Sequence, residues 1–247
     1  TQSIEEGQIY FNTQVWSVLS GAATPEQIKT CLESVKEKLA TPYGLMLCAP
    51  PFIYASRDIM SSVVYLPGIK ENAGIFNHTQ GWGIIAEIMN GNGDRAYEYC
   101  KAALPAAYNT KAEIRQSEPY VIGQTTYSTY SKRPGNTRVS WLSGAATWNY
   151  YSITQYMLGI RPQYDGLLID PCVKHDWDSF SVERRWRNMN ISIEVKNPSR
   201  VCRGIESLEV DGKKLDSVLV PVDLLHDGSR IIAVMGKNAL PVRNQRM

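Results

Sequence analysis

The stretch GIRP, residues 159–162, marks the point at which the spacing of apolar residues changes along this chain. After it, apolar residues alternate with polar ones, most clearly in MNISIEVK at residues 189–196, and this alternation is typical of a half-buried strand. Asp211-Gly212 follows one such run and Asp227-Gly228 precedes another, and both dipeptides favour tight turns. We therefore expect the C-terminal part to be a set of β-strands.

Before residue 159 the pattern is helical. Thr24, followed by Pro25 and Gln27, forms a capping box with proline in the first helical turn. The residues that follow form an apolar stripe at helical spacing: Ile28, Cys31, Leu32, Val35 and Leu39. Further helices are predicted at 82–89, which is apolar nearly all round and so buried, and at about 141–157.

Helices followed by strands predict an α plus β protein with two domains, residues 1–161 and 162–247. The chain has 247 residues and a formal net charge of +2, which gives no electrostatic footprint for nucleic acid or an anionic membrane. No apolar run reaches the roughly 18 residues that a membrane span needs.

The five cysteines contain no CxxC pair, so we expect reduced cysteines in a cytoplasmic protein, without a zinc site. Because the chain starts at Thr1 without an initiator methionine, we expect it to be part of a longer protein.

The segment KENAGIFNHTQGW, residues 70–82, mixes charges, amides and His78 into an apolar run. One interpretation is a loop entering a helix, with His78 and Trp82 on one buried face. The other is an anion site, because free N–H groups at a helix start and a histidine both attract negative charge. The residues alone leave both open.

Two other segments have the chemistry of a binding site. In WLSGAATW, residues 141–148, Ser143 offers a hydroxyl and Gly144 lets a ligand approach the backbone, although a helix-packing patch has the same composition. The segment is not GxSxG, which disfavours a serine hydrolase. The loop EPYVIGQTTYSTY, residues 118–130, combines aromatic rings, hydroxyls and an amide, as a sugar site does.

Two charged clusters in the strand-rich half favour other interpretations. KHDWD, residues 174–178, has no second histidine nearby, so we interpret it as a solvated loop rather than a metal site. RRWR, residues 184–187, favours a domain or subunit contact.

Several motifs, in this order and spacing, resemble the C-terminal part of the cellobiose phosphorylases, the inverting disaccharide phosphorylases of glycoside hydrolase family 94. The motifs are GQIYFNTQVWSVLSG, TPYGLMLCAPP, KENAGIFNHTQGW, AEIRQSEPYVIGQ, WLSGAATW, YDGLLIDPC and VDGKK. The resemblance implies that residues 1–161 are the last part of an (α/α)6 barrel and residues 162–247 a β jelly-roll. It also implies phosphorolysis of cellobiose to α-glucose 1-phosphate and glucose, with inorganic phosphate as co-substrate and no cofactor or metal.

By motif match, the resemblance implies a role for six residues. His78, Ser143 and Gly144 would contact phosphate, Gln124 would touch the glucosyl unit, and Lys70 and Glu71 would line the acceptor side. Ser143 stands where the family commonly has threonine, which keeps the hydroxyl.

The family's general acid is the aspartate of an Asp-Trp-Asn-Asp type motif, which is absent from these 247 residues. In the family this motif lies upstream, together with a phosphate-binding arginine. The resemblance therefore implies that this chain acts only with an N-terminal part of the same protein, in a homodimer. The alternatives are a laminaribiose- or chitobiose-type phosphorylase, a non-catalytic carbohydrate-binding or assembly module, and a hydrolase or lyase on the same helical scaffold.

Overall fold

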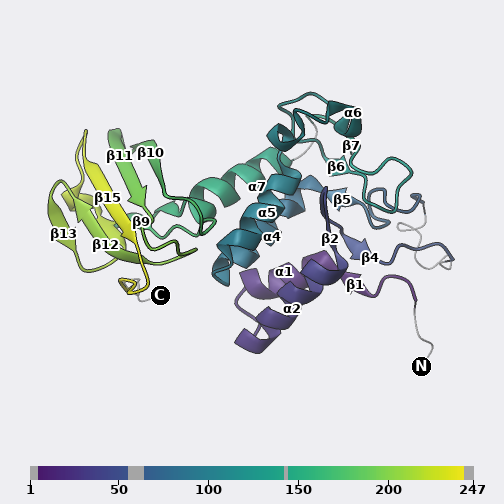
Figure 1. Ribbon diagram of the computed structural model, residues 1–247, viewed down its shortest axis with the longest axis horizontal. Helices are drawn as coiled ribbons and strands as arrows, with labels where there is room; N and C mark the ends of the chain where they lie inside the picture. The colour runs from purple at the N-terminus through teal and green to yellow at the C-terminus, as the bar shows by residue number, and fades with distance from the viewer. Residues whose placement is uncertain (1–4, 55–63, 142–143, 242–247) are drawn as a thin grey trace. The chain divides into compact units, whose positions relative to one another are not determined.

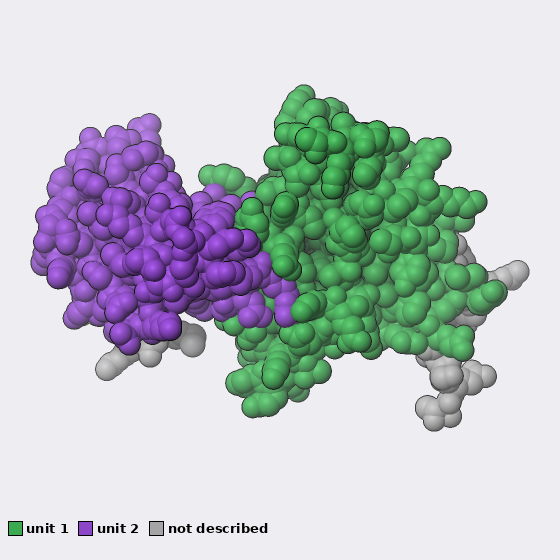
Figure 2. All heavy atoms as spheres, in the orientation of Figure 1, with its two compact units in different colours: residues 1–90, 97–152 green, residues 91–96, 153–247 purple. Residues whose placement is uncertain are grey.

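A computed structural model describes residues 5–54, 64–141 and 144–241. The chain is a mixed α/β protein with several sheets, and it forms two compact units (Figure 2). Unit 1 comprises residues 1–90 and 97–152, and unit 2 comprises residues 91–96 and 153–247. The domain border at residues 161/162, the (α/α)6 barrel and the jelly-roll remain predictions.

Unit 1 is built around the helices α1 (Phe11–Leu19), α2 (Pro25–Lys38), α4 (Asn77–Met89) and α7 (Ala145–Tyr151) (Figure 1). α4 packs against both α1 and α7. The helix α5 (Gly93–Ala103) starts in the segment that belongs to unit 2, and the short helices η2 (Pro105–Tyr108) and α6 (Ala112–Arg115) follow it.

Short strand pairs position the loops of unit 1. β1 (Ile9–Tyr10) pairs with β4 (Cys48–Ala49), and β2 (Ala40–Thr41) pairs with β3 (Gly44–Leu45). A three-stranded sheet joins β5 (Ile75–Phe76), β6 (Thr125–Thr126) and β7 (Thr137–Arg138). Segments about fifty residues apart in the sequence therefore lie side by side immediately before α4.

The helical predictions for α2 are confirmed. Its capping box forms as expected, because the Gln27 backbone N–H donates to the Thr24 hydroxyl and the Thr24 N–H donates to the Gln27 side chain. Leu32, Val35 and Leu39 of the predicted stripe are buried.

The buried helix predicted at 82–89 is confirmed, but it begins five residues earlier, at Asn77. Ten of its residues are buried, as expected of a helix that packs against others on several sides. Glycines make this packing close: a Cβ at Gly83 would lie 2.5 Å from the Leu45 side chain.

The third predicted helix is shorter than expected at its start. α7 begins at Ala145 instead of Trp141, and it continues at Ser152 into a π-helical segment, η3 (Ser152–Met157). The backbone of Trp141 has a positive φ of 66°, which a helix cannot accommodate.

Unit 2 contains a five-stranded sheet in the order β10-β11-β15-β12-β13. Its strands are β10 (Ser179–Trp186), β11 (Met189–Lys196), β12 (Ile205–Val210), β13 (Lys213–Leu215) and β15 (Arg230–Met235). The predicted alternation in β11 is confirmed, since Ile191, Ile193 and Val195 are buried. A smaller sheet has the order β14-β9-β8, with β8 (Ile160–Pro162), β9 (Gly166–Ile169) and β14 (Leu219–Pro221), and the short helix η4 (Val222–Leu224) follows β14.

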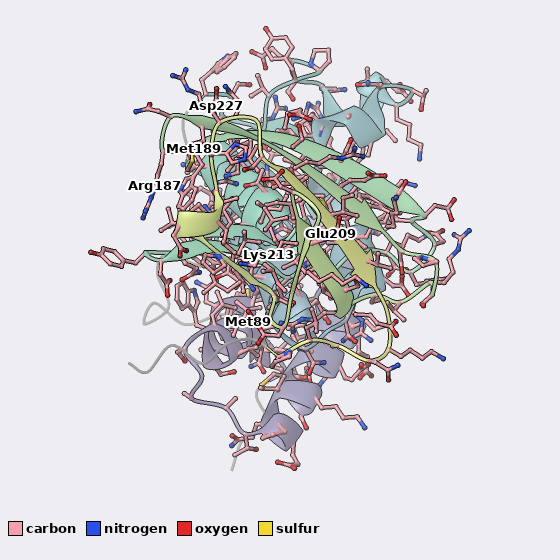
Figure 3. The ribbon with its side chains drawn as sticks, turned by 90° about the vertical axis from the view of Figure 1, so that its left-hand side faces the viewer. Met89, Arg187, Met189, Glu209, Lys213 and Asp227 are labelled. Atoms are coloured by element: carbon pink, nitrogen blue, oxygen red, sulfur yellow. The ribbon has the colours of Figure 1, made fainter. Side chains whose placement is uncertain are left out.

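The predicted turns also form. Asp211 and Gly212 both have positive φ, as the two-residue turn between β12 and β13 requires. Asp227 accepts a 2.7 Å hydrogen bond from the backbone N–H of Asn190, which fixes the start of β11 near the β10–β11 turn at Arg187 (Figure 3).

In the part of the chain that the structure describes, no helix has the length and apolar character that a membrane crossing requires. All five cysteines fall in the described ranges and are free thiols, as predicted, and Cys48, Cys100 and Cys172 are buried.

Candidate functional site

The first residue of α4, Asn77, holds the predicted sugar loop in place. Its backbone N–H donates to the Gln124 carbonyl at 2.9 Å, and its side-chain amide donates to the Gly123 carbonyl at 2.9 Å. The Thr126 hydroxyl donates to the Asn77 side-chain oxygen at 3.1 Å. Asn77 thus uses every polar group except its backbone carbonyl to bind the loop that carries Gln124. In the sequence, Asn77 lies one residue before His78.

The carbonyl of Asn77 binds the third segment. The Asn149 side-chain amide donates to it at 2.9 Å and also donates to the Ala145 carbonyl at 2.8 Å. Gly81 lets α7 approach, because a Cβ there would lie 2.7 Å from the Trp148 carbonyl oxygen. We call this set the Asn77 junction: Asn77 with Gly123, Gln124, Thr126 and Asn149. It brings together the starts of α4 and α7 and the Gln124 loop.

His78 is half-buried among aromatic rings. Its imidazole makes edge contacts with Phe76 and Trp82, with ring centroids 5.6 Å and 5.2 Å away. Burial lowers the pKa of His78 below its ordinary value, so the ring is neutral at pH 7 and offers one N–H donor. His78 and Trp82 lie in contact on α4, but both are half-buried, so the fully buried face of the first interpretation does not form. His78 lies in the first turn of α4, as the anion-site interpretation expects.

Gly144 is the N-cap residue of α7, and the space beside it is open. A Cβ built there meets no atom of the described residues within 4 Å, and its φ of −80° is allowed for any residue. Neither strain nor crowding within the chain requires glycine here. Ser143 lies outside the described residues.

Gln124 and Glu71 both have side-chain groups without a hydrogen-bond partner among the described residues. The Gln124 side chain is half-buried and makes no hydrogen bond with the described residues. One oxygen of Glu71, Oε2, is buried and also has no donor among them. Such groups cost free energy unless a ligand or water satisfies them.

Lys70 and Glu71 lie in a tight loop organised by the buried residue Asn72. The Asn72 amide donates to the carbonyls of Phe52 and Tyr65 at 2.8 Å and 2.9 Å, and its oxygen accepts from the Phe52 N–H at 2.7 Å. Lys70 adopts a positive φ of 47°, and its ammonium lies 5.3 Å from the centre of the Tyr65 ring. This loop leads through β5 directly to Asn77.

The region that contains this geometry matches a family model. Residues 1–159 match the model described as "Glycosyl hydrolase 94 superfamily, catalytic domain". This chain belongs to the glycosyl hydrolase 94 superfamily. All six predicted site residues fall within the matched region.

The relatives of this GH94 chain include several phosphorylases. It is 34% identical to the N,N'-diacetylchitobiose phosphorylase of Vibrio proteolyticus over 96% of its length, and 33% identical to the solabiose phosphorylase of Paenibacillus borealis over 88%. It is 30% identical to the cellobionic acid phosphorylase of Neurospora crassa over 78%. The match covers 29%, 28% and 25% of these proteins, so the chain spans less than a third of their length.

A solved structure of a family GH92 α-mannosidase from Bacteroides thetaiotaomicron matches at a TM-score of 0.32 and 14% identity. The match covers 90% of this chain and 23% of that one.

The sequence does not single out the two asparagines of the Asn77 junction. Asn77 is one of several polar residues near His78, and Asn149 lies within the helix predicted at about 141–157. Their buried amides bind backbone carbonyls of segments far apart in the sequence, which no local pattern reveals. The sole available signal was that asparagine is unfavourable in a helix interior unless its side chain has a partner.

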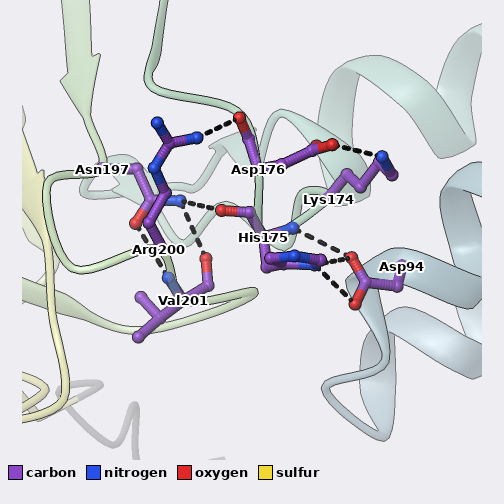
Figure 4. Close-up of polar contacts among 7 residues, drawn as sticks. All are labelled: Asp94, Lys174, His175, Asp176, Asn197, Arg200 and Val201. Carbon is purple, nitrogen blue, oxygen red and sulfur yellow. Dashed lines mark hydrogen bonds and ion pairs between the residues drawn. The ribbon is translucent and has the colours of Figure 1, made fainter.

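The Lys174-His175-Asp176 cluster of unit 2 holds together parts of that unit (Figure 4). The ring nitrogen Nδ1 of His175 lies 2.8 Å from one Asp94 oxygen, and the His175 backbone N–H donates to the same oxygen at 2.9 Å. Burial opposes ionisation of Asp94, but the bonds from His175 outweigh it and lower the pKa of that carboxyl. Among the described residues, no three potential ligands are grouped as a metal ion would require.

Proposed function

We propose that this GH94 chain supplies the phosphate cradle and part of the sugar site of an inverting disaccharide phosphorylase. The observation that carries the proposal is the Asn77 junction, which joins the segments of His78, Gln124 and Gly144 within the region that matches the GH94 catalytic domain. The names of the relatives support the same reaction class.

In the proposed reaction, a phosphate oxygen forms a bond to the anomeric carbon while the bond to the leaving sugar oxygen breaks. Attack comes from the face opposite the leaving group, so a β-linked disaccharide gives an α-sugar 1-phosphate and a free sugar. A carboxylic acid gives its proton to the leaving oxygen. An inverting hydrolase needs a second carboxylate to activate water. Phosphate is already a nucleophile at neutral pH. In place of the second carboxylate, a phosphorylase therefore requires hydrogen-bond donors that hold the phosphate anion.

The proposed cradle consists of neutral and backbone donors. The His78 N–H, the backbone beside Gly144 and the Ser143 hydroxyl would bind phosphate oxygens through charge-assisted hydrogen bonds. The open space beside Gly144 and the neutral state of His78 are both compatible with a bound anion. Because these groups carry no net charge of their own, a cation from elsewhere in the protein is expected to complete the site.

We propose that the sugar binds to the side chains of Gln124 and Glu71, which have groups without a partner among the described residues. The Gln124 amide would bind hydroxyls of the glycosyl unit that is transferred, and the Glu71 carboxylate would accept from hydroxyls of the leaving sugar. Lys70 lies over Tyr65 in the same loop and would extend this acceptor side. The general acid is expected upstream of this chain, so we propose that the chain alone has no activity.

The identity of the disaccharide is a finer proposal. Cellobiose is the substrate that the sequence motifs imply. N,N'-diacetylchitobiose is the second candidate, because two of the relatives that match over most of this chain are N,N'-diacetylchitobiose phosphorylases, at 34% and 36% identity.

The decisive experiment uses the complete protein encoded by the reading frame that contains this chain. It would be incubated with cellobiose, N,N'-diacetylchitobiose, laminaribiose or solabiose, each with and without inorganic phosphate. We expect release of a sugar 1-phosphate and a free sugar only when phosphate is present. Turnover without phosphate would indicate a hydrolase. Binding of a disaccharide without any turnover would indicate a carbohydrate-binding module. Light scattering of the same protein would test the proposed homodimer.

A further inference from the structure

Unit 1 contains a cavity whose lining is distinct from the Asn77 junction. Its volume is about 440 Å³, and it opens between residues 66–69 and the loop that joins β6 to β7. We call it the Tyr127 pocket. Its lining includes Ile69, Tyr127, Tyr130, Lys132, Arg133 and Arg138, and none of the six predicted site residues.

The walls of this pocket are fixed by backbone contacts. The Ser128 N–H donates to the Gly68 carbonyl at 2.9 Å, and a Cβ at Gly68 would lie 2.4 Å from the Ser131 nitrogen. Within the loop, the Gly135 N–H donates to the Tyr127 carbonyl at 2.8 Å, and the Tyr127 N–H donates to the Asn136 carbonyl at 2.9 Å. The shape of the pocket is therefore formed before any ligand arrives, which reduces the entropic cost of binding.

The pocket is strongly cationic for its size. Lys132, Arg133 and Arg138 line it, and no Asp or Glu is among the described residues that do so. None of these three cations forms an ion pair within the described ranges. Arg138 is instead held over the Tyr127 ring, with its guanidinium carbon 5.7 Å from the ring centre. Three cations without an acidic partner among the described residues favour an anionic ligand.

The remaining walls are aromatic and apolar. Tyr127 and Tyr130 offer ring faces with hydroxyl groups at their edges, and Tyr130 is 45% exposed. Leu66 and Ile69 line the pocket as well. Bare phosphate would use none of this surface, whereas the C–H face of a sugar ring would pack on it.

We propose that the Tyr127 pocket binds a hexose carrying an anionic group, either a carboxylate or a phosphate ester. The cations would bind the anionic group, and the tyrosines would contact the ring. This inference does not rest on the proposed function, because it concerns other residues and requires no turnover.

The test is direct binding to the full 247-residue chain, measured by calorimetry at low ionic strength, where screening is weak. The probes are D-glucuronate, α-D-glucose 1-phosphate, D-glucose and inorganic phosphate. We expect one of the two anionic sugars to bind at least about tenfold more tightly than glucose and than inorganic phosphate, as one or more charge-assisted hydrogen bonds would provide. The first two probes distinguish a carboxylate from a phosphate ester.

Matched variants locate the binding. Arg138→Gln should weaken binding of the preferred anionic sugar about tenfold. The exposed double variant Lys132→Gln/Arg133→Gln should also weaken it, and it keeps the test valid if Arg138→Gln does not fold. Lys36→Gln, at an exposed lysine of α2, should leave this binding unchanged. Binding of glucose as tight as that of both anionic sugars, or undiminished binding in both Arg138→Gln and the double variant, would overturn the proposal.

Discussion

The side-chain amide of Asn149 donates a 2.9 Å hydrogen bond to the backbone carbonyl of Asn77, which lies 72 positions earlier in the sequence. Asn149 is 1% exposed and Asn77 is 3% exposed, so water does not substitute for this bond. The bond fixes the first turn of α4, which carries His78, against α7, which follows Gly144. The two segments proposed to bind phosphate are thus held by a buried contact that need not touch the ligand.

The first prediction concerns this bond. Asn149→Ala should lower the free energy of unfolding by about 1–3 kcal/mol, because it leaves the buried Asn77 carbonyl without this donor. Asn149→Asp should cost more, because it places a carboxylate against two carbonyl oxygens. Urea denaturation would measure both. Asn12→Ala on the exposed face of α1 is the control and should change stability by less than about 0.5 kcal/mol. Equal stability of all three variants would show that the bond does not matter.

The second prediction concerns the contact between α4 and α7. Gly81→Ala should destabilise the chain by about 1–3 kcal/mol, since its new methyl group would lie 2.7 Å from the Trp148 carbonyl oxygen. The Trp148 carbonyl belongs to the helix backbone, so it cannot move aside as the end of a flexible side chain can. Thermal unfolding should show a clearly lower midpoint than for the wild type and for Asn12→Ala, at an exposed position of α1. A Gly81→Ala melting temperature equal to or above that of the wild type would contradict the close packing.

The third prediction follows from the lowered pKa of His78. The unfolded chain binds a proton at this histidine near pH 6.5, whereas the folded chain binds it at lower pH because of burial. The free energy of unfolding should therefore fall as the pH drops below about 6.5. His78→Gln removes this contribution, so its stability should depend less on pH between about 7 and 5 than that of the wild type. Urea denaturation across this range would measure it, and identical slopes would exclude the effect.

The fourth prediction tests the role of His78 in the proposed reaction. In the complete protein, His78→Ala should lower kcat/KM for phosphate about 100-fold, as the loss of one donor to a reacting oxyanion does. His78→Gln retains an N–H donor and should keep more of that activity than His78→Ala. Initial rates at varied phosphate, with both variants confirmed as folded by circular dichroism, would measure it. Unchanged phosphorolysis by His78→Ala would remove the residue from the site.

The local elements could be predicted from the sequence because their signals are local. The capping box at Thr24, the alternation in residues 189–196 and the Asp211-Gly212 turn each depend on a few neighbouring residues, and all three form. The start of α7 was predicted too early because the aromatic and small residues at 141–148 fit a helix. The backbone turns at Val139 and Trp141, both with positive φ, prevent this.

The arrangement of the site could not be predicted in the same way. Its determinants are contacts between positions tens of residues apart, such as Asn149 with Asn77 and Asn72 with Phe52. The loop predicted to suit a sugar, residues 118–130, supplies Tyr127 and Tyr130 of the Tyr127 pocket, but the sequence shows the cations of this pocket only as an ordinary polar run. Whether these cations have acidic partners depends on which residues the fold brings near them.

The fifth prediction separates the ligand role of Gly144 from any structural one. Gly144→Ala should leave the unfolding free energy within about 0.5 kcal/mol of the wild type, because the added methyl meets no described atom and the backbone is unstrained. In the complete protein the same methyl would occupy space proposed for phosphate, so the KM for phosphate should rise about tenfold, as for the loss of one hydrogen bond to an anion. Phosphate kinetics and urea denaturation of the same variant would measure the two effects. A fully active and stable Gly144→Ala protein would mean that phosphate binds elsewhere, because nothing in the described chain competes for that space.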